Sequence, residues 1–323
     1  MPQNKENMRL LEFYTSFPTE ESCKKDFKLM REKVGITCKV CGGCAHYWLK
    51  SKEMYQCKLN SCRFRTSLKS GTVMENSKLS FHIWYKAMHL ITATKNNISA
   101  VEVQRQLGIK NYEPVFEMLH KLRLIMGKRD EQYTLDGIVE FDEGFFSNSE
   151  ILKENEFTNQ KEELKRGKGS QKKSAIAVLH STSKVELNLK SKSKHKSDRK
   201  PKFLKMYQLA FVNSKEISQT IKKSISKKAE LITDKAKYYN DLQDKVTKHT
   251  PYDSKKVNIL KVLPWVHKAI SNIKGTLWNI YKGVSNDYMQ NYLSEYCFKY
   301  NRRSFGVNVF NRLVLASALY QWN

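Results

Sequence analysis

The chain has 323 residues, of which 58 are Lys or Arg and 32 are Asp or Glu, so its formal net charge is +26. An excess this large favours a polyanionic partner, most commonly nucleic acid and less commonly an anionic membrane surface. A hydrophobic content of 40% excludes a wholly disordered chain. Because we find no apolar run of membrane-span length and no signal-peptide core, we expect a reducing cytoplasm, where clustered cysteines favour a metal over disulfides.

Five of the seven cysteines lie close together near the N-terminus. Cys38 and Cys41 form a C-x-x-C knuckle, and Cys57 and Cys62 form a second, wider pair. The segment between the pairs alternates aromatic and polar residues, which predicts a β-hairpin. Two such pairs joined by a hairpin predict a zinc ribbon, in which four thiolates hold a structural Zn²⁺. Cys44 competes with Cys41 as a ligand, and we assign it as a spare thiol. The alternative is a loop of ordinary reduced cysteines.

Two helices are predicted after the cysteines. The first is indicated by apolar residues at helical spacing, namely Trp84, Met88 and Ile91. Ser99 followed by Glu102 is a capping-box pattern, which predicts the start of a second, shorter helix. We expect this helix to turn Val101 and Leu107 inward and to end at Gly108.

A third helix is predicted over the segment NYEPVFEMLHKLRLIMGKR, whose apolar residues share one side. They are Phe116, Leu119 and Leu122. The opposite side is expected to expose His120, Lys121 and Arg123. Three helices with a tight turn before the last are typical of a helix-turn-helix, whose last helix reads DNA. The alternative is a helical hairpin used only for packing.

From residue 133 the pattern becomes extended. In YTLDGIVEFDEGFFS, Val139 and Phe141 alternate with Glu140 and Asp142, and Glu143 follows directly. Carboxylates in a central strand are costly unless a metal or another partner neutralises them. This strand is therefore a candidate for carrying chemistry.

The later segments predict an α/β domain of the ribonuclease H-like type. A basic glycine-containing loop, RGKGS, precedes a second strand, a third strand follows, and then come a helix and a fourth strand that ends at Asp234. In a ribonuclease H-like sheet the first and fourth strands are neighbours, so Asp142 and Asp234 should face each other across a gap suited to a divalent metal.

The last third of the sequence is helical. The segment PWVHKAISNIKG should place a helix beside the two aspartates. A second helix carries a stripe of tyrosines, which we expect to pack in the core: Tyr288, Tyr292, Tyr296 and Tyr300. Asn301, Arg302 and Arg303 follow, and they are candidates either for capping this helix or for gripping a phosphate.

These segments together resemble insertion-sequence transposases with an N-terminal zinc ribbon, the ISXO-like bacterial branch related to the eukaryotic Merlin elements. The resemblance covers nearly the whole chain. Besides the cysteine knuckles, it rests on CRFRTSLKSGTVMENSKL, SAVEVQRQLG, KLRLIMGKRD, LDGIVEFDEGFF, RGKGS, TDKAKYY, PWVHKAISNIK and YLSEYCFKYNRR.

The resemblance implies a DDE-type active site that uses Mg²⁺ or Mn²⁺. It implies that Asp142 and Asp234 are the two catalytic aspartates, and that Asn272 takes the third position, where Glu is commoner. A neutral Asn binds a hard cation more weakly than a carboxylate does, so His267 and Glu143 stay open as further ligands. Lys274 would be the accompanying basic residue and, with the RGKGS loop, would hold phosphates.

The resemblance also implies the organisation and the reaction. Residues 1–72 would form the zinc ribbon, 73–132 the helix-turn-helix, and 133–323 the ribonuclease H-like domain. The protein would bind terminal inverted repeats, cleave there and join the freed end to target DNA, acting as a dimer or larger assembly at the bacterial nucleoid in the cytoplasm. Two alternatives remain, a DNA-binding protein with an inert site and a nuclease that cuts without strand transfer.

Overall fold

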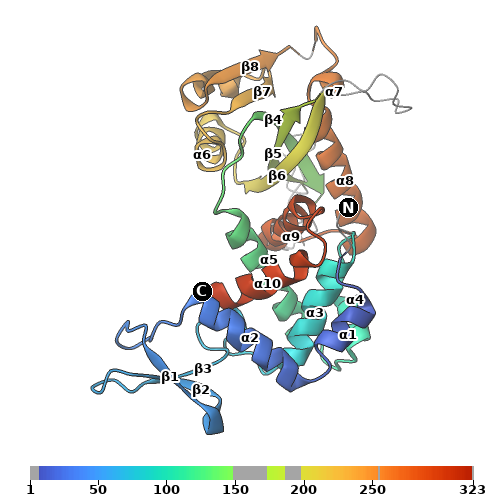
Figure 1. Cartoon of the computed structure of the whole chain (residues 1–323). Coiled ribbons are helices and arrows are strands. Elements are labelled where there is room, and N and C mark those ends of the chain that lie inside the picture. The colour runs from blue at the N-terminus through green and yellow to red at the C-terminus, as the bar shows by residue number, and fades with distance from the viewer. Residues whose placement is uncertain (1–6, 148–172, 186–197, 254, 322–323) are drawn as a thin grey trace, which may run out of the picture. The chain divides into compact units, whose positions relative to one another are not determined.

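A computed structural model describes residues 7–147, 173–185, 198–253 and 255–321 of the chain (Figure 1). The chain divides into two compact units. The N-terminal unit comprises Met1–Arg129 and Arg302–Asn323, and the sheet unit comprises Asp130–Asn301. The sequence placed all of residues 133–323 in one domain, whereas the structure groups the last 22 of them, from residue 302 to residue 323, with the N-terminal unit.

Helices make up most of the N-terminal unit. They are α1 (Leu10–Ser16), α2 (Glu20–Val34), α3 (Phe81–Ala93), α4 (Ala100–Leu107), α5 (Glu113–Asp130) and α10 (Asn308–Leu319). The predicted inner face of α3 is confirmed, because Trp84, Met88 and Ile91 are fully buried. Helix α10 joins this core through Phe310, whose ring centroid lies 5.5 Å from that of Phe17 and 5.9 Å from that of Tyr85.

The short helix α4 differs from its prediction in one respect. Ser99 is the N-cap as expected, since its side chain accepts the Glu102 N–H at 3.1 Å. The expectation that Val101 turns inward was wrong, because Val101 is 63% exposed and the buried residues are Ala100 and Val103. In a helix of only eight residues, an inner side through Ala100 and Val103 fits helical spacing as well as one through Val101. The sequence pattern therefore does not select between these two sides.

The predicted exposed face of α5 was also wrong. His120, Lys121 and Arg123 are all buried. The Lys121 ammonium lies 2.6 Å from the Glu117 carboxylate, and the Arg123 guanidinium donates to the Ile98 carbonyl at 3.4 Å. Long basic side chains can bury their stems and satisfy their charged ends locally, which helical spacing does not reveal.

A small antiparallel sheet lies in the cysteine-rich segment of the chain. It contains β1 (His46–Leu49), β2 (Met54–Cys57) and β3 (Arg65–Ser67) in the order β1-β2-β3, with the short 3-10 helix η1 (Lys50–Lys52) between the first two. The predicted β-hairpin is therefore confirmed.

The sheet unit is built on five strands: β4 (Ile138–Ser147), β5 (Lys173–Lys184), β6 (Arg199–Leu209), β7 (Glu230–Asp234) and β8 (Lys248–Tyr252). Their order is β6-β5-β4-β7-β8. Strand β5 runs antiparallel to both β4 and β6, whereas β7 is parallel to β4 and β8 is parallel to β7. The predicted succession of three strands, a helix and a fourth strand beside the first is confirmed, and β8 is an additional strand that the sequence analysis missed.

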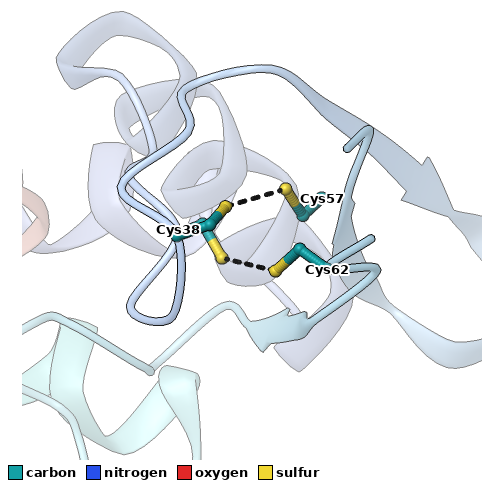
Figure 2. A group of neighbouring side chains, drawn as sticks. Cys38, Cys57 and Cys62 are labelled. Carbon is teal, nitrogen blue, oxygen red and sulfur yellow. Dashed lines mark hydrogen bonds between the residues drawn. The ribbon is translucent and has the colours of Figure 1, made fainter. Parts of the chain in front are cut away.

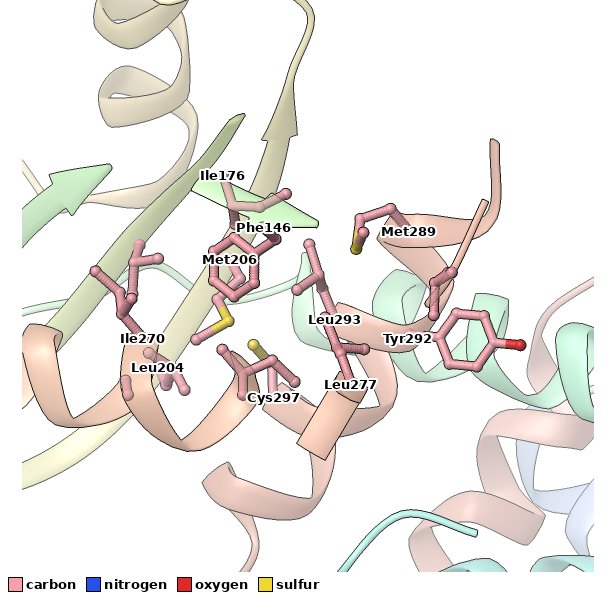
Figure 3. Packing of buried hydrophobic residues seen from close by; sticks show 14 of the residues in the cluster. Phe146, Ile176, Leu204, Met206, Ile270, Leu277, Met289, Tyr292, Leu293 and Cys297 are labelled. Carbon is pink, nitrogen blue, oxygen red and sulfur yellow. The ribbon is translucent and has the colours of Figure 1, made fainter. Parts of the chain in front are cut away.

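Helices cover both faces of this sheet, and alternation along the strands explains why. Val139 and Phe141 of β4 pack in a core with α6 (Ser214–Ser224) and the 3-10 helix η3 (Lys237–Lys245). Phe146 and its neighbours on β5 and β6 pack in a second core with α8 (Pro264–Tyr281) and α9 (Met289–Asn301) (Figure 3). The remaining short helices are α7 (Ile259–Val262) and η4 (Asn286–Tyr288).

The end of α9 completes the second core. Three of the four predicted tyrosines, Tyr292, Tyr296 and Tyr300, belong to it, whereas Tyr288 is 43% exposed. Asn301 is buried, and its side chain binds both the N–H and the carbonyl of Leu204 on β6. It therefore fastens α9 to the sheet. In the described parts of the chain, none of the helices is both long enough and apolar enough to cross a membrane.

Candidate active site and cysteine cluster

The four predicted zinc ligands meet at one point of the N-terminal unit. The Sγ atoms of Cys38, Cys41, Cys57 and Cys62 lie within 4.8 Å of one another. Cys38 and Cys62 have a sulfur–sulfur distance of 3.6 Å, and Cys41 and Cys57 one of 3.5 Å (Figure 2). Four thiolates bound tetrahedrally to Zn²⁺ at about 2.3 Å would be about 3.8 Å apart, so the cluster fits this ion.

The local backbone and the thiol pKa values support the same interpretation. A Cβ atom on Gly43 would lie 3.3 Å from the Cys41 sulfur, so glycine lets the chain close over the cluster. The backbone N–H of Cys41 lowers the pKa of Cys38 to about 7. The Phe64 N–H favours the Cys62 thiolate, but burial and the neighbouring thiols raise the pKa of Cys62 to about 12. A bound cation would remove this conflict between neighbouring thiolates. Cys44 is exposed, in keeping with a spare thiol.

The two predicted catalytic aspartates lie on neighbouring strands of the sheet unit. Strands β4 and β7 pair in parallel up to Glu140 and Ile232. Asp142 and Asp234 each lie two residues beyond this last pair. Continuing the same parallel register therefore puts the two aspartates side by side. Asp234 ends β7, and its Oδ1 accepts the Ala236 N–H at 3.1 Å. Two carboxylates so placed offer the oxygen ligands that a hard divalent cation prefers.

His267 reaches this pair from α8. Its Nδ1 lies 3.7 Å from Oδ2 of Asp142, and the side chains of the two residues are 24% and 20% exposed. Burial lowers the pKa of His267, and the charge of Asp234 opposes that shift. Its Nε2 is buried without a hydrogen-bond partner among the described residues. Such an orphaned nitrogen beside two carboxylates is consistent with a site that receives a further group.

Glu143 lies on the opposite face of β4 from Asp142. It accepts hydrogen bonds from the hydroxyl groups of Tyr238 at 3.2 Å and Tyr239 at 2.5 Å. Burial raises the pKa of Glu143, and the charge of Asp234 raises it further. The hydrogen bonds from the two tyrosines lower this pKa and so act in the opposite direction. The carboxylate thus ties β4 to the segment that follows Asp234, and both of its oxygens are already occupied by tyrosines.

Asn272 and Lys274 lie further along α8, and both are exposed. Burial raises the pKa of Tyr296 on α9, and the Asn272 side chain acts against this rise. Five residues separate Asn272 from His267, which is about 140° around a helix, so the two project in different directions. Lys274 is seven residues from His267, which is nearly two full helical turns. The two side chains therefore leave the helix in directions that differ by only about 20°. Its ammonium lies 5.4 Å from the ring centre of Phe146. The structure thus brings Asp142, Asp234 and His267 together, and Asn272 projects from a different side of α8.

The sequence analysis missed the role of Glu140. This residue is fully buried, and its Oε2 accepts the N–H groups of Trp265 at 2.8 Å and Val266 at 3.0 Å, in the first turn of α8. Its Oε1 lies 3.1 Å from Nη1 of Arg199. Burial raises the pKa of Glu140 to about 7, and Arg199 and the two N–H groups act against this rise. The signal available in the sequence was its period-two spacing from Asp142, which puts both on one face.

The RGKGS loop, which was expected to hold phosphates, lies outside the described residues. Within those residues, the four cysteines are the one group of three or more His, Cys, Asp or Glu side chains whose ligand atoms all lie within 4.8 Å of one another.

Comparisons with known proteins give one strong match. A sequence model of the ISXO2-like transposase domain matches residues 134–301, which is more than half of the chain. A comparison with curated proteins finds no match.

Two solved structures also match weakly. One is titled "Crystal structure of a pre-cleavage Mos1 transpososome", with 9% identity, a TM-score of 0.29, and coverage of 73% of this chain and 79% of that chain. The other is "Mos1 transposase paired-end complex with left transposon end", with 10% identity, a TM-score of 0.27 and the same coverage. Similarities this low carry no inference about the present chain. The match of the sequence model over residues 134–301 does support an inference. It shows that the chain belongs to the ISXO2-like transposase family.

Proposed function

We propose that this protein is a DDE-type transposase with a ribonuclease H-like catalytic domain. It would bind the ends of an insertion sequence, cleave the DNA there and join the freed 3′ end to target DNA. The observation that carries the proposal is the parallel pairing of β4 with β7, which sets Asp142 and Asp234 beside each other in a domain of the transposase family.

The two aspartates are proposed as the ligands of Mg²⁺ or Mn²⁺. When bound, the metal would lower the pKa of the attacking water or 3′-hydroxyl and stabilise the leaving oxygen at the scissile phosphate. Asp142 and Asp234 supply the negative charge that such an ion requires, and their strands hold them in place. Asn272 is proposed as the third ligand by family resemblance, which requires its side chain to turn toward the aspartate pair. Lys274, exposed on the side of α8 that carries His267, is proposed to hold a phosphate.

The N-terminal unit is proposed to bind the element ends. Exposed basic side chains lie on the small sheet and in the turns that join its strands, where they can contact phosphates. They are Lys50, Lys52, Lys58, Arg63 and Arg65. Tyr47 is 57% exposed, and the Lys58 ammonium lies 4.9 Å from its ring centre. Helices α3, α4 and α5 are proposed as the helix-turn-helix, and the burial of His120, Lys121 and Arg123 leaves any contact with bases to other residues. Transposition joins two ends, so we propose a dimer or a larger assembly.

An assay with labelled element ends and a target plasmid tests the proposal. The full-length protein is incubated with both DNAs and Mg²⁺, and Asp142→Ala is run beside it. Joined product in the first sample alone supports the transposase assignment. Cut ends without joined product would reduce the assignment to a nuclease, and binding without cutting would reduce it to a DNA-binding protein. The affinity for end DNA should fall steeply with salt, because many counterions leave the DNA when so basic a protein binds.

One observation favours the second candidate, a site that is inert or that only hydrolyses DNA. Asn272 lies about 140° around α8 from His267, so it projects away from the side of the helix that meets Asp142. A protein of this kind would bind element ends and give no joined product in the assay above.

A further inference from the structure

Helix α8 begins without a side-chain cap of its own. Helices α2, α3, α4 and α6 start with a Thr, Ser, Ser or Asn whose side chain accepts a backbone N–H of the first turn. Helix α8 has Leu263 at this position, and no side chain there accepts a hydrogen bond. A helix start leaves several N–H groups without partners, and a buried start must find acceptors elsewhere. The sequence of α8 itself provides none.

Glu140 provides the missing acceptor from a different element. Pro264 has no N–H, and the next two residues, Trp265 and Val266, both donate to the Glu140 carboxylate at 2.8 and 3.0 Å. The next N–H, that of His267, already bonds within the chain to the Leu263 carbonyl at 3.2 Å. The carboxylate therefore accounts for the whole first turn. Its negative charge also suits the positive end of the helix dipole.

Arg199 extends this attachment to the residue before the helix. Its guanidinium lies 3.1 Å from Glu140 and donates to the Val262 carbonyl at 2.6 Å. The Arg199 carbonyl in turn accepts the indole N–H of Trp265 at 3.1 Å. Glu140 and Arg199 are both buried, so these contacts exchange little with water. The start of α8 is therefore held by β4 and β6 together.

The consequence of this attachment is the register of α8 along β4. Alternate residues of β4 face the helix, and successive turns of the helix meet them in order. Glu140 meets the first turn, Asp142 lies 3.7 Å from His267, and the ring of Phe146 lies 5.4 Å from the Lys274 ammonium. Between them, a Cβ atom on Gly144 would lie 3.4 Å from Ile270. A shift at the first contact would therefore displace every later one.

We propose that Glu140 is a positioning residue, which caps α8 from β4 and thereby holds His267 and Lys274 in register with Asp142. The proposal rests on the proposed function for its catalytic consequence, but its structural part does not. Glu140 contacts neither DNA nor metal in this scheme. It acts through the helix that it caps.

The test compares Glu140→Gln with a matched control, Glu216→Gln. Glu216 also accepts two backbone N–H groups in the sheet unit, those of Ala210 at 2.8 Å and Phe211 at 2.7 Å, but it lies on α6 and is only half-buried. Hydrogen exchange is measured at residues 264–267, and the imidazole NMR signals of His267 report its contact with Asp142. Cleavage and end binding are measured on the same full-length samples.

We expect Glu140→Gln to accelerate exchange in the first turn of α8 and to shift the His267 signals. Cleavage should fall roughly ten- to a hundredfold, as small displacements in an active site do, while end binding is retained. Glu216→Gln should change none of these. A variant with Glu140→Ala and Arg199→Met removes the acceptor without leaving a buried charge unpaired, and should enlarge the effects.

Three results would overturn the proposal. They are unchanged exchange in both Glu140 variants, His267 signals that stay in place when exchange accelerates, and cleavage equal to that of the Glu216→Gln control. If the unaltered protein fails to cleave, the proposed function fails instead, and the exchange and NMR measurements still decide whether Glu140 positions α8.

Discussion

The Nδ1 atom of His267 lies 3.7 Å from the Oδ2 atom of Asp142, although 124 residues of other structure separate them in the sequence. The first belongs to α8 and the second to the central strand β4. The distance exceeds that of a hydrogen bond, so the two groups are close without being joined. Chemistry at Asp142 is therefore expected to depend on α8 as well as on the neighbouring strand β7.

Asp142→Ala should abolish both cleavage and joining, and so should Asp234→Ala. Each change removes a negative charge from the proposed metal site, and the neighbouring carboxylate of Glu143 is already held by Tyr238 and Tyr239. End binding should persist, since it is assigned to the N-terminal unit. Cleavage by either variant at the unaltered rate would overturn the enzyme assignment.

Asn272→Ala should lower cleavage by about a hundredfold or more if Asn272 is the third ligand. The matched variant is Tyr296→Phe, which removes the hydroxyl group whose pKa the Asn272 side chain influences. This variant should retain or increase cleavage. Full activity in Asn272→Ala would place the third ligand elsewhere, and His267→Ala is then the next variant to measure.

Cys38→Ser should release zinc from the N-terminal unit. Purified protein is expected to carry about one zinc per chain, because four thiolates complete a tetrahedral site. Metal analysis of the variant should show the loss, while the sheet unit keeps its fold. Cys44→Ser is the control and should keep its zinc, since Cys44 is exposed and lies outside the four-sulfur group. Equal zinc content in both variants would refute the ligand assignment.

Gly144→Ala should destabilise the sheet unit by about 1–3 kcal/mol, the usual cost of an added methyl group in a packed core. The added Cβ would lie 2.5 Å from the Phe146 ring, which is itself buried. Gly275→Ala is the matched control, because a Cβ there meets no atom within 4 Å and alanine favours a helix interior by up to about 1 kcal/mol. Melting temperatures that move in the same direction would contradict this packing.

Acid should destabilise the N-terminal unit through His120. Burial, with help from Arg123, lowers the pKa of His120 from 6.5 to about 4. The unfolded chain therefore takes up the proton first, and stability falls as the pH drops from about 6.5 to about 4. The loss is roughly 3 kcal/mol at most. His120→Leu should flatten this part of the stability curve, and an unchanged slope would assign the acid sensitivity to other groups.

The sequence was sufficient for features that depend on short-range pattern. The cysteine spacing located the four-sulfur cluster, and strand alternation located the β4 face that carries Asp142. Ser99 was identified as an N-cap because capping is a local rule. The order of the first four strands followed from their succession along the chain.

Other features depend on partners that are distant in the sequence. A buried carboxylate in a strand suggests a metal, but Glu140 is satisfied by Arg199 and by the start of α8, which no local pattern indicates. Helical spacing correctly placed the inner side of α5. It could not show that the opposite side, with Lys121 and Arg123, is buried as well. The same limit applies to α10, whose apolar residues fit more than one core.

The return of α10 to the N-terminal unit has a consequence for biosynthesis. Phe310 packs against Phe13 and Tyr85, so the ring cluster that stabilises the first helices is incomplete until the last part of the polypeptide has left the ribosome. The sheet unit lies wholly between these two segments and is finished earlier. A nascent chain would therefore hold the folded sheet unit before the core of its N-terminal unit is complete. Premature termination near residue 301 would yield the sheet unit without the ring cluster that stabilises the unit proposed to bind element ends.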